Sequence, residues 1–267
     1  MEKMRRDHLF WGVVLTVLGT VLLFQELGWI RFGWEVLWPL FLVGAGLWLL
    51  ARSTQQQAPA TVRSLAIPLE TAERALVRLH HGAGRLQLDG SAAAQQLLEG
   101  TFGGGVQAQT QREGSTLRVD LRVPGDSCCL GFPWYTRGAL DWSLGLSREV
   151  DLALDVKTGA SDNRLDLGLL RVTNLNLRTG ASSTTVTLPA SAGYTRVHVE
   201  SGAASVSLRV PEGVAARVRI QSGLSGITVD AGRFPRAGDV WRSPDYDTAT
   251  NKVDMDIQTG VGSVDVR

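Results

Sequence analysis

The hexapeptide VKTGAS at residues 156–161 recurs as LRTGAS at 177–182, VESGAA at 199–204, IQSGLS at 220–225 and IQTGVG at 257–262. A weaker copy, LHHGAG, stands at residues 79–84. The glycines of the five phrases are separated by 21, 22, 21 and 37 residues. A repeat of this length is typical of stacked supersecondary units, each of which buries its apolar face only against its neighbours.

Each repeat predicts one coil of a β-solenoid. Apolar and polar residues alternate before the glycine, as in Val150–Val156, with the period of two that marks a strand. At the glycine, where a side chain would clash with the adjacent coil, the chain turns into a second short strand such as Thr185–Leu188. Equivalent positions then stack about 4.8 Å apart as parallel strands, and crossovers of this kind are almost always right-handed. The turn glycines are Gly82, Gly159, Gly180, Gly202, Gly223 and Gly260, and the hydroxyl ladder expected beside them is Thr158, Thr179, Ser201, Ser222 and Thr259.

We therefore predict an all-β right-handed single-stranded β-helix over residues 63–267, with a β-sandwich as the alternative. The 37-residue spacing indicates a surface loop inserted near 231–252, and an interruption of the alternation indicates another insertion near 124–141. Because the chain stops soon after the strand that ends at Val266, this strand is expected to leave an edge open.

The first 52 residues predict a transmembrane helical hairpin. Leu9–Phe24 and Val36–Ala51 each run for sixteen residues without a charge. At about 1.5 Å per residue, one more turn on each makes it long enough for the ~30 Å hydrocarbon layer. Five of the eight tryptophans fall in this region, near the expected membrane interfaces. We expect helices at about 9–27 and 34–51 and a polar linker at 53–62; a signal peptide is the alternative for the first apolar run.

The distribution of Lys and Arg around the two spans predicts the orientation. Three such residues precede the first helix, Arg31 alone lies in the connection, and Arg52 and Arg63 follow the second helix. By the positive-inside rule, both ends of the hairpin and the solenoid lie in the cytoplasm.

The composition excludes several classes of protein. With 27 Lys and Arg against 26 Asp and Glu, the chain is not a nucleic-acid binder that works by bulk positive charge. Cys128 and Cys129 are adjacent, so a disulfide between them would not cross-link distant parts of the chain. His80 and His81 are also neighbours, and adjacent strand residues point to opposite faces, so no metal site is expected. No group that would mark a catalytic base or nucleophile accompanies the acidic residues, and we expect no catalytic residues and no cofactor.

Two outward features bear on what the solenoid contacts. The outward column before the glycines varies from coil to coil, whereas binding to a regular array such as ice requires the same residue on every coil, so we expect no array binding. This column consists of Lys157, Arg178, Glu200, Gln221 and Gln258. The second feature is an aromatic segment, which we expect either to contact a partner or to cap an open end of the coil stack, with capping favoured. Its aromatic residues are Phe132, Trp134, Tyr135 and Trp142.

Parts of the chain resemble a known family. LFWG at 9–12, LG at 18–19 and LWPL at 37–40 resemble the transmembrane region of LiaI/LiaF-like bacterial cell-envelope stress proteins. LEGTFGGG at 98–105 and the TGAS phrases resemble the toast-rack and LiaG-like, adhesin-like β-solenoid domains that are often attached to it. The resemblance implies a bacterial membrane-anchored protein with a non-enzymatic role. In the LiaF branch it implies restraint of a sensor histidine kinase.

Together these observations predict a multi-pass protein of the bacterial inner membrane that acts as a non-enzymatic interaction module in envelope-stress sensing or signalling. The expected partners are the lipid bilayer and a membrane sensor kinase or another membrane protein, and not nucleic acid. One alternative is a membrane-tethered scaffold that self-associates through its solenoid edges. Another, which requires the solenoid to lie outside, is a surface adhesin or polysaccharide-binding protein.

Overall fold

The computed structural model describes residues 62–124 and 140–267, which are all-β. Within these two ranges, no apolar helix reaches the length needed to span a membrane. The helices expected at 9–27 and 34–51 lie outside the described residues. The strands are β1 (Val62–Pro68), β2 (Arg74–Asp89), β3 (Gln96–Gly103), β4 (Gln107–Glu113), β5 (Thr116–Arg122), β6 (Trp142–Leu146), β7 (Asp151–Asp166), β8 (Arg171–Thr187), β9 (Tyr194–Arg209), β10 (Ala215–Val229), β11 (Arg236–Ala237), β12 (Val240–Arg242) and β13 (Lys252–Val266).

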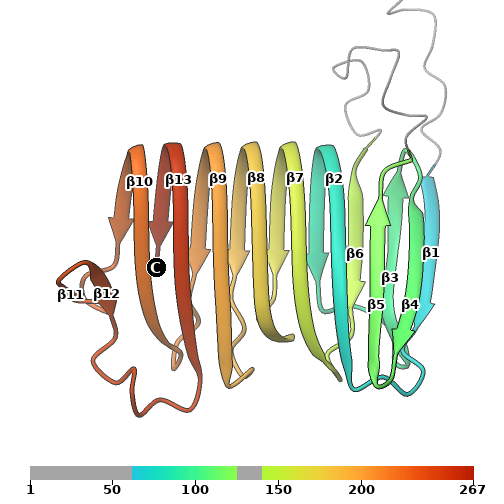
Figure 1. The fold of residues 1–267 in the computed structure, drawn as a ribbon, viewed down its shortest axis with the longest axis horizontal. Helices are drawn as coiled ribbons and strands as arrows, with labels where there is room; N and C mark the ends of the chain where they lie inside the picture. Colours follow the sequence, from blue (N-terminus) through green and yellow to red (C-terminus); the bar gives the residue numbers. More distant parts are fainter. Residues whose placement is uncertain (1–61, 125–139) are drawn as a thin grey trace, which may run out of the picture. The chain divides into compact units, whose positions relative to one another are not determined.

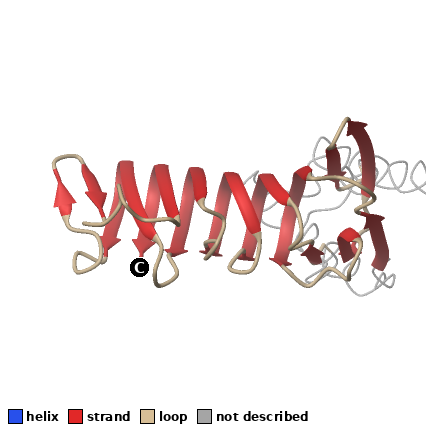
Figure 2. Ribbon diagram, turned by 90° about the horizontal axis from the view of Figure 1, so that it is seen from below, coloured by secondary structure: helices blue, strands red, loops and turns tan. Residues whose placement is uncertain are grey.

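Each long strand bends at its glycine, so that a single strand supplies both arms of a coil. Figure 1 shows these bent strands side by side as a row of arches, and Figure 2 shows the row from below. In β7, the buried residues are even-numbered from Leu152 to Thr158 and odd-numbered from Ser161 to Leu165. The alternation therefore shifts by one residue at Gly159, and this shift keeps the buried side chains of both arms inside the coil. We call the residues before each glycine the first arm and those after it the second arm.

Neighbouring coils pair in parallel with the repeated phrases in register. Thr158 lies opposite Thr179, which lies opposite Ser201, and the column continues through Thr259 to Ser222. The solenoid-like all-β fold expected from the repeat is thus confirmed for the described residues. The glycines are needed for this stacking: a Cβ on Gly180 would lie 3.0 Å from the carbonyl oxygen of Gly159, and one on Gly260 would lie 2.8 Å from that of Gly202.

The order of the coils departs from the order of the sequence at the C-terminal side. The sheet runs β1-β3-β6-β2-β7-β8-β9-β13-β10-β12-β11, so β13 lies between β9 and β10 and pairs in parallel with both. The segment after β10 is therefore more than a surface loop, because it forms the β11–β12 hairpin and returns the chain to insert β13. The expectation that the strand ending at Val266 leaves an open edge is wrong, since both edges of β13 are paired.

The other side of the stack is built from strands that lack the repeated phrase. The first arm of β2 pairs in parallel with β5, and its second arm pairs with β6, so β5 and β6 act as the two arms of one further coil. Antiparallel strands extend this coil: β3 pairs with β6, β1 with β3, and β4 with β5. We call this side of the stack the closed end.

A continuous apolar core fills the space between the two arms. It extends from Ile67 near the closed end to Val266 in β13. The segments that connect successive coils contribute to it as well, because Leu167, Leu170 and Leu188 are all buried. Burial of these columns is the main stabilising term of the fold, since a coil without neighbours would expose its inner residues to water.

Candidate functional site

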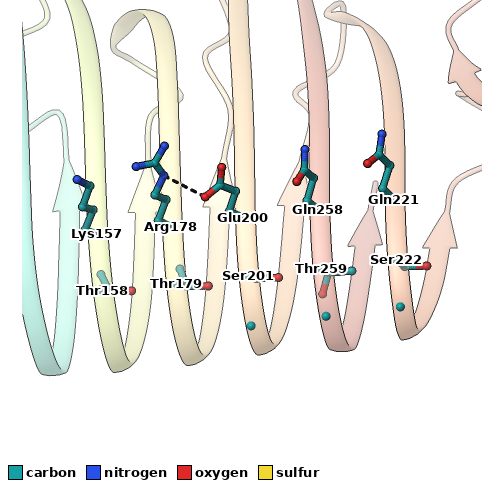
Figure 3. Close-up of a pocket in the computed structure, with 13 residues that line it drawn as sticks. Lys157, Thr158, Arg178, Thr179, Glu200, Ser201, Gln221, Ser222, Gln258 and Thr259 are labelled. Carbon is teal, nitrogen blue, oxygen red and sulfur yellow. Dashed lines mark ion pairs between the residues drawn. The ribbon is translucent and has the colours of Figure 1, made fainter.

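A shallow groove of about 670 Å³ runs along the outside of the stack, at the bends of five neighbouring coils (Figure 3). We call it the bend groove. In spatial order its outward column reads Lys157, Arg178, Glu200, Gln258 and Gln221, one residue from each of β7, β8, β9, β13 and β10. The hydroxyl ladder and the glycines Gly202, Gly223 and Gly260 line the rest of it.

The strand period explains why the groove carries one column of each kind. The residue two places before the glycine points outward, and the residue one place before it points inward. Parallel register then repeats the same position from coil to coil, so that Lys157, Arg178 and Glu200 lie directly opposite one another. The bend itself carries no side chain, which leaves a trough beside the column.

The charges along the groove are not uniform. Arg178 Nε lies 3.1 Å from Glu200 Oε2, and His198 Nε2 lies 2.9 Å from Glu200 Oε1. The hydrogen bond with His198, with a smaller contribution from Arg178, lowers the pKa of the Glu200 carboxyl, which therefore stays ionised. Lys157 forms no ion pair within residues 62–124 and 140–267. The groove is therefore positive at the β7 side and neutral at the β10 side.

The positive side continues beyond the groove toward the closed end. His80 of β2 lies in register with Lys157 on one side and with Arg122 of β5 on the other. Partial burial lowers the pKa of His80, and the neighbouring charges of Lys157 and Arg122 lower it further. We call Arg122, His80, Lys157 and Arg178 the basic column; it places three permanent positive charges on four adjacent coils.

The hydroxyl ladder forms the inner side of the groove. Asn163 Nδ2 donates to the hydroxyl of Thr158 at 3.2 Å and to that of Thr184 at 2.9 Å. The buried hydroxyl oxygens of Thr179 and Ser201 have no hydrogen-bond partner among the described residues. Because these hydroxyls are buried, the groove presents the charges and amides of its outward column and the backbone of its bends to an extended polar ligand. No cluster of three His, Cys, Asp or Glu side chains suited to a metal ion occurs in the same part of the chain.

Trp142, the one residue of the aromatic segment that the structure describes, belongs to the core. Its ring packs edge-on against Phe102 with centroids 5.0 Å apart and lies 5.2 Å from His81. Its indole Nε1 donates to the carbonyl of Gly103 at 3.2 Å, and only 1% of its surface is exposed. Trp142 thus packs at the closed end of the stack. Phe132, Trp134 and Tyr135, together with Cys128 and Cys129, lie outside the described residues.

Two features of the surface escaped the sequence analysis. Aligning LHHGAG with VKTGAS would have placed His80 beside Lys157, but nothing in the sequence near Arg122 marks β5 as the next strand. The second feature is an exposed edge on β10, where the sequence order of the coils pointed to the last strand instead. Both depend on which coils are neighbours, a property that a local pattern does not carry.

Comparisons with known proteins agree with this architecture. The family model of the N-terminal domain of toast_rack, DUF2154, matches residues 55–209, and that of the LiaI-LiaF-like transmembrane region matches residues 9–50. None of the curated proteins compared with the chain matches it. A crystal structure of a proposed cell adhesion protein from Clostridium sporogenes ATCC 15579 has a TM-score of 0.71 at 16% identity, over 78% of this chain and 98% of that one.

A second solved structure, a proposed adhesin from Bacteroides fragilis NCTC 9343, is 6% identical over 78% of this chain and 97% of that one, with a TM-score of 0.29. The Clostridium likeness shows a shared fold. The toast_rack match covers more than half of the residues and the transmembrane match adjoins it. The chain therefore belongs to the toast_rack family and carries a LiaI-LiaF-like transmembrane region before its toast_rack domain.

Proposed function

We propose that this protein is a non-enzymatic, membrane-anchored interaction module of bacterial envelope-stress sensing or signalling, and that it binds an acidic, extended segment of another membrane protein in the bend groove. The observation that carries the proposal is the basic column, which lies along a solenoid whose chain also matches a LiaI-LiaF-like transmembrane region. No enzyme family is among the matches.

Charge complementarity supports an acidic partner. Lys157 and Arg122 are free of ion pairs within the described ranges, whereas Arg178 is paired with Glu200, which His198 also contacts. An acidic segment that runs along the column would meet the charges of Arg122 and Lys157 two coils apart, with the imidazole of His80 between them. Such complementarity mainly accelerates association and selects the partner. The side-chain amides of Gln258 and Gln221 and the backbone of the bends then supply hydrogen bonds to an extended chain.

The distribution of Lys and Arg supports a solenoid on the cytoplasmic side, with two membrane-spanning helices at about 9–27 and 34–51. There the groove would meet cytoplasmic segments of a sensor kinase or another membrane protein. Topology is tested with the variant C128S/C129S/S183C, because Ser183 is exposed on β8. We expect an impermeant thiol reagent to label this cysteine only after lysis. Labelling in intact cells would contradict the orientation and favour a surface adhesin or a polysaccharide-binding protein.

The binding proposal is tested by purifying the tagged full-length protein from stressed cells and identifying the membrane proteins that accompany it. Lys157→Glu reverses the charge of the groove. Arg164→Glu makes the same change in charge on the exposed second arm of the same strand and serves as the matched control. We expect Lys157→Glu to lower partner recovery by roughly five-fold, the effect of about 1 kcal/mol, while Arg164→Glu leaves it unchanged.

Two results would contradict the binding proposal. One is the recovery of no membrane protein with the unsubstituted chain under stress. The other is an equal loss of the partner with Lys157→Glu and Arg164→Glu, which would show that net charge, and not the groove, governs the association.

A further inference from the structure

The strand at the C-terminal side of the stack, β10, is only partly covered. β12 pairs with it at Arg217, Val218 and Arg219. Beyond these residues, no strand of the described chain pairs with that side of β10. We call residues 221–229 the open edge. Their backbone N–H and C=O groups on this side have no strand partner, and this is the condition under which strands of different chains associate.

The open edge also exposes positions that belong to the core. Ile227 lies in register with Val264 of β13, which in turn lies opposite Val206 of β9. Val264 is 1% exposed and Val206 is 2% exposed, whereas Ile227 is 39% exposed. On the outer face of the same segment, Leu224 is 82% exposed. One more strand beside β10 would bury Ile227 as its counterparts are buried.

The open edge lacks the devices that normally prevent strands from pairing. Residues 221–229 read QSGLSGITV and contain no charged residue and no proline. Natural edge strands are usually protected by lysine, proline or a bulge. At the closed end, the exposed strand β4 contains Arg112 and Glu113. The contrast indicates that the open edge is kept available for pairing.

We propose that the open edge pairs with the open edge of a second copy of this chain, in an antiparallel, two-fold symmetric arrangement. In a two-fold interface the same residues face one another, so that any charge would be set close to its own copy. The uncharged open edge is free of that repulsion. Pairing centred on Ile227 places Ile227 against its copy and Val229 against Ser225 of the copy. Because residues two apart share a face, the inward positions of both copies then continue one core.

The inference goes beyond the proposed function, and the residues that pair in this register, 225–229, lie outside the bend groove, whose lining on β10 ends at Gly223. A paired edge of five residues, 225–229, buries less area than the ~800 Å² per partner of a standard stable interface. We therefore expect a weak pair whose formation depends on the membrane. Anchoring through the transmembrane region confines the copies and raises their effective concentration.

Thiol cross-linking of the full-length protein in membranes tests the inference. In the background C128S/C129S, we compare Ile227→Cys with Ser183→Cys, an exposed position on the inner coil β8. A short thiol-reactive cross-linker is expected to give on the order of ten-fold more dimer with Ile227→Cys, because pairing holds the two thiols together. Equal yields, or an adduct with a different protein in place of the dimer, would overturn the inference.

An added lysine provides a second test. Thr228→Lys places a charge on the open edge at an exposed position, and Thr185→Lys places the same charge at the matching position of β8. We expect Thr228→Lys to abolish the Ile227→Cys dimer and Thr185→Lys to retain it. A dimer that withstands Thr228→Lys would overturn the inference. Co-expression of Ser225→Cys chains with Val229→Cys chains tests the register: the mixture should cross-link more than either chain alone.

The outcomes of these tests are independent of the groove. Loss of cross-linking with retained recovery of a membrane partner would reject the open-edge pairing alone. Retained cross-linking in Lys157→Glu, with loss of the partner, would assign the partner to the groove and the dimer to the edge.

Discussion

The two ends of the coil stack are covered by different kinds of strands, although the coils between them repeat one pattern. At the closed end, β5 and β6 form a full additional coil outside β2, and antiparallel strands extend it. On the opposite side, the β11–β12 hairpin covers only the first arm of β10. The core of a solenoid needs cover at both ends, and the described residues place a full additional coil at only one of them.

The side chains that cover the two ends differ in the same way. Trp142 and Phe102 are fully buried at the closed end. On the β10 side, Phe234 is buried, but Trp241 of β12 is only partly buried and stacks with Arg236 at 5.2 Å. Ser243 contacts the first arm of β10, because its Oγ accepts a hydrogen bond from the backbone N–H of Ala216 at 2.9 Å. Nothing equivalent reaches the second arm among the described residues, and this difference leads to four predictions.

The largest expected effect separates Trp142 from Trp241. Trp142→Ala removes a fully buried ring and its hydrogen bond to Gly103, and we expect it to lower the free energy of unfolding by about 3–5 kcal/mol. Trp241→Ala removes a half-exposed ring and should cost about 1–2 kcal/mol. Denaturant unfolding of the full-length protein in detergent, followed by its β-sheet circular dichroism, measures both. Equal losses would show that the two ends contribute alike.

The next effect concerns the bend glycines. A Cβ on Gly159 would lie well inside the van der Waals distance of the Gly82 carbonyl oxygen, whereas a Cβ on Gly82 meets nothing within 4 Å. Gly82 is at the coil next to β5 and β6, which have no bend of their own. We expect Gly159→Ala to cost about 1–3 kcal/mol and Gly82→Ala to be neutral or slightly stabilising. A large loss with Gly82→Ala would mean that the closed end packs against this bend as well.

A smaller effect is expected from pH at the closed end. His81 Nε2 donates to the carbonyl of Leu140 at 2.7 Å, while its buried Nδ1 has no hydrogen-bond partner among the described residues. Burial lowers the pKa of His81 in the folded protein, partly offset by Leu140 and Asp141. The unfolded chain then binds more protons as the pH falls below about 6.5, so stability decreases on acidification through this range.

His81→Gln tests this explanation of the pH dependence. The Gln amide can donate the same hydrogen bond to Leu140 but does not titrate. The variant should lose stability less steeply between neutral and mildly acidic pH than the unsubstituted protein, whatever the cost of the substitution itself. Identical slopes in the two proteins would assign the pH dependence to other groups, such as His80.

The repeated coils were the part of the fold that sequence could predict. The period of two identifies inward and outward positions within one strand: Asp155, Asp254 and Asp256 alternate with buried residues and lie in outward columns. The glycine spacing likewise indicates where each bend falls. Both properties depend on neighbours within one repeat, so the sequence contains them directly.

The order of the coils and the strands that cover the two ends could not be predicted from the sequence. IQSG in β10 and IQTG in β13 are nearly identical, so either strand would fit beside β9. Insertion of β13 depends on a connection that forms its own hairpin. The coil of β5 and β6 lacks the repeated phrase altogether. The basic column could be predicted only in part for the same reason. Lys157 and Arg178 were recognised as outward, but Arg122 joins them only through the pairing of β5 with β2.

The smallest loss of stability is expected at Val229, and it emerges from one substitution made on two neighbouring coils. Val229 of β10 and Val266 of β13 lie in register, but Val266 is fully buried and Val229 is half-buried. In dilute detergent, where the weak pair dissociates, we expect Val266→Ala to cost about 1.5–3 kcal/mol and Val229→Ala less than about 1 kcal/mol. If a second copy covers the open edge in the membrane, Val229→Ala should also reduce the Ile227→Cys cross-link there, whereas an unchanged cross-link would place the pairing outside the core register. Val229 is therefore expected to contribute less than Val266 to the stability of a single chain, but to contribute to the pairing of two chains.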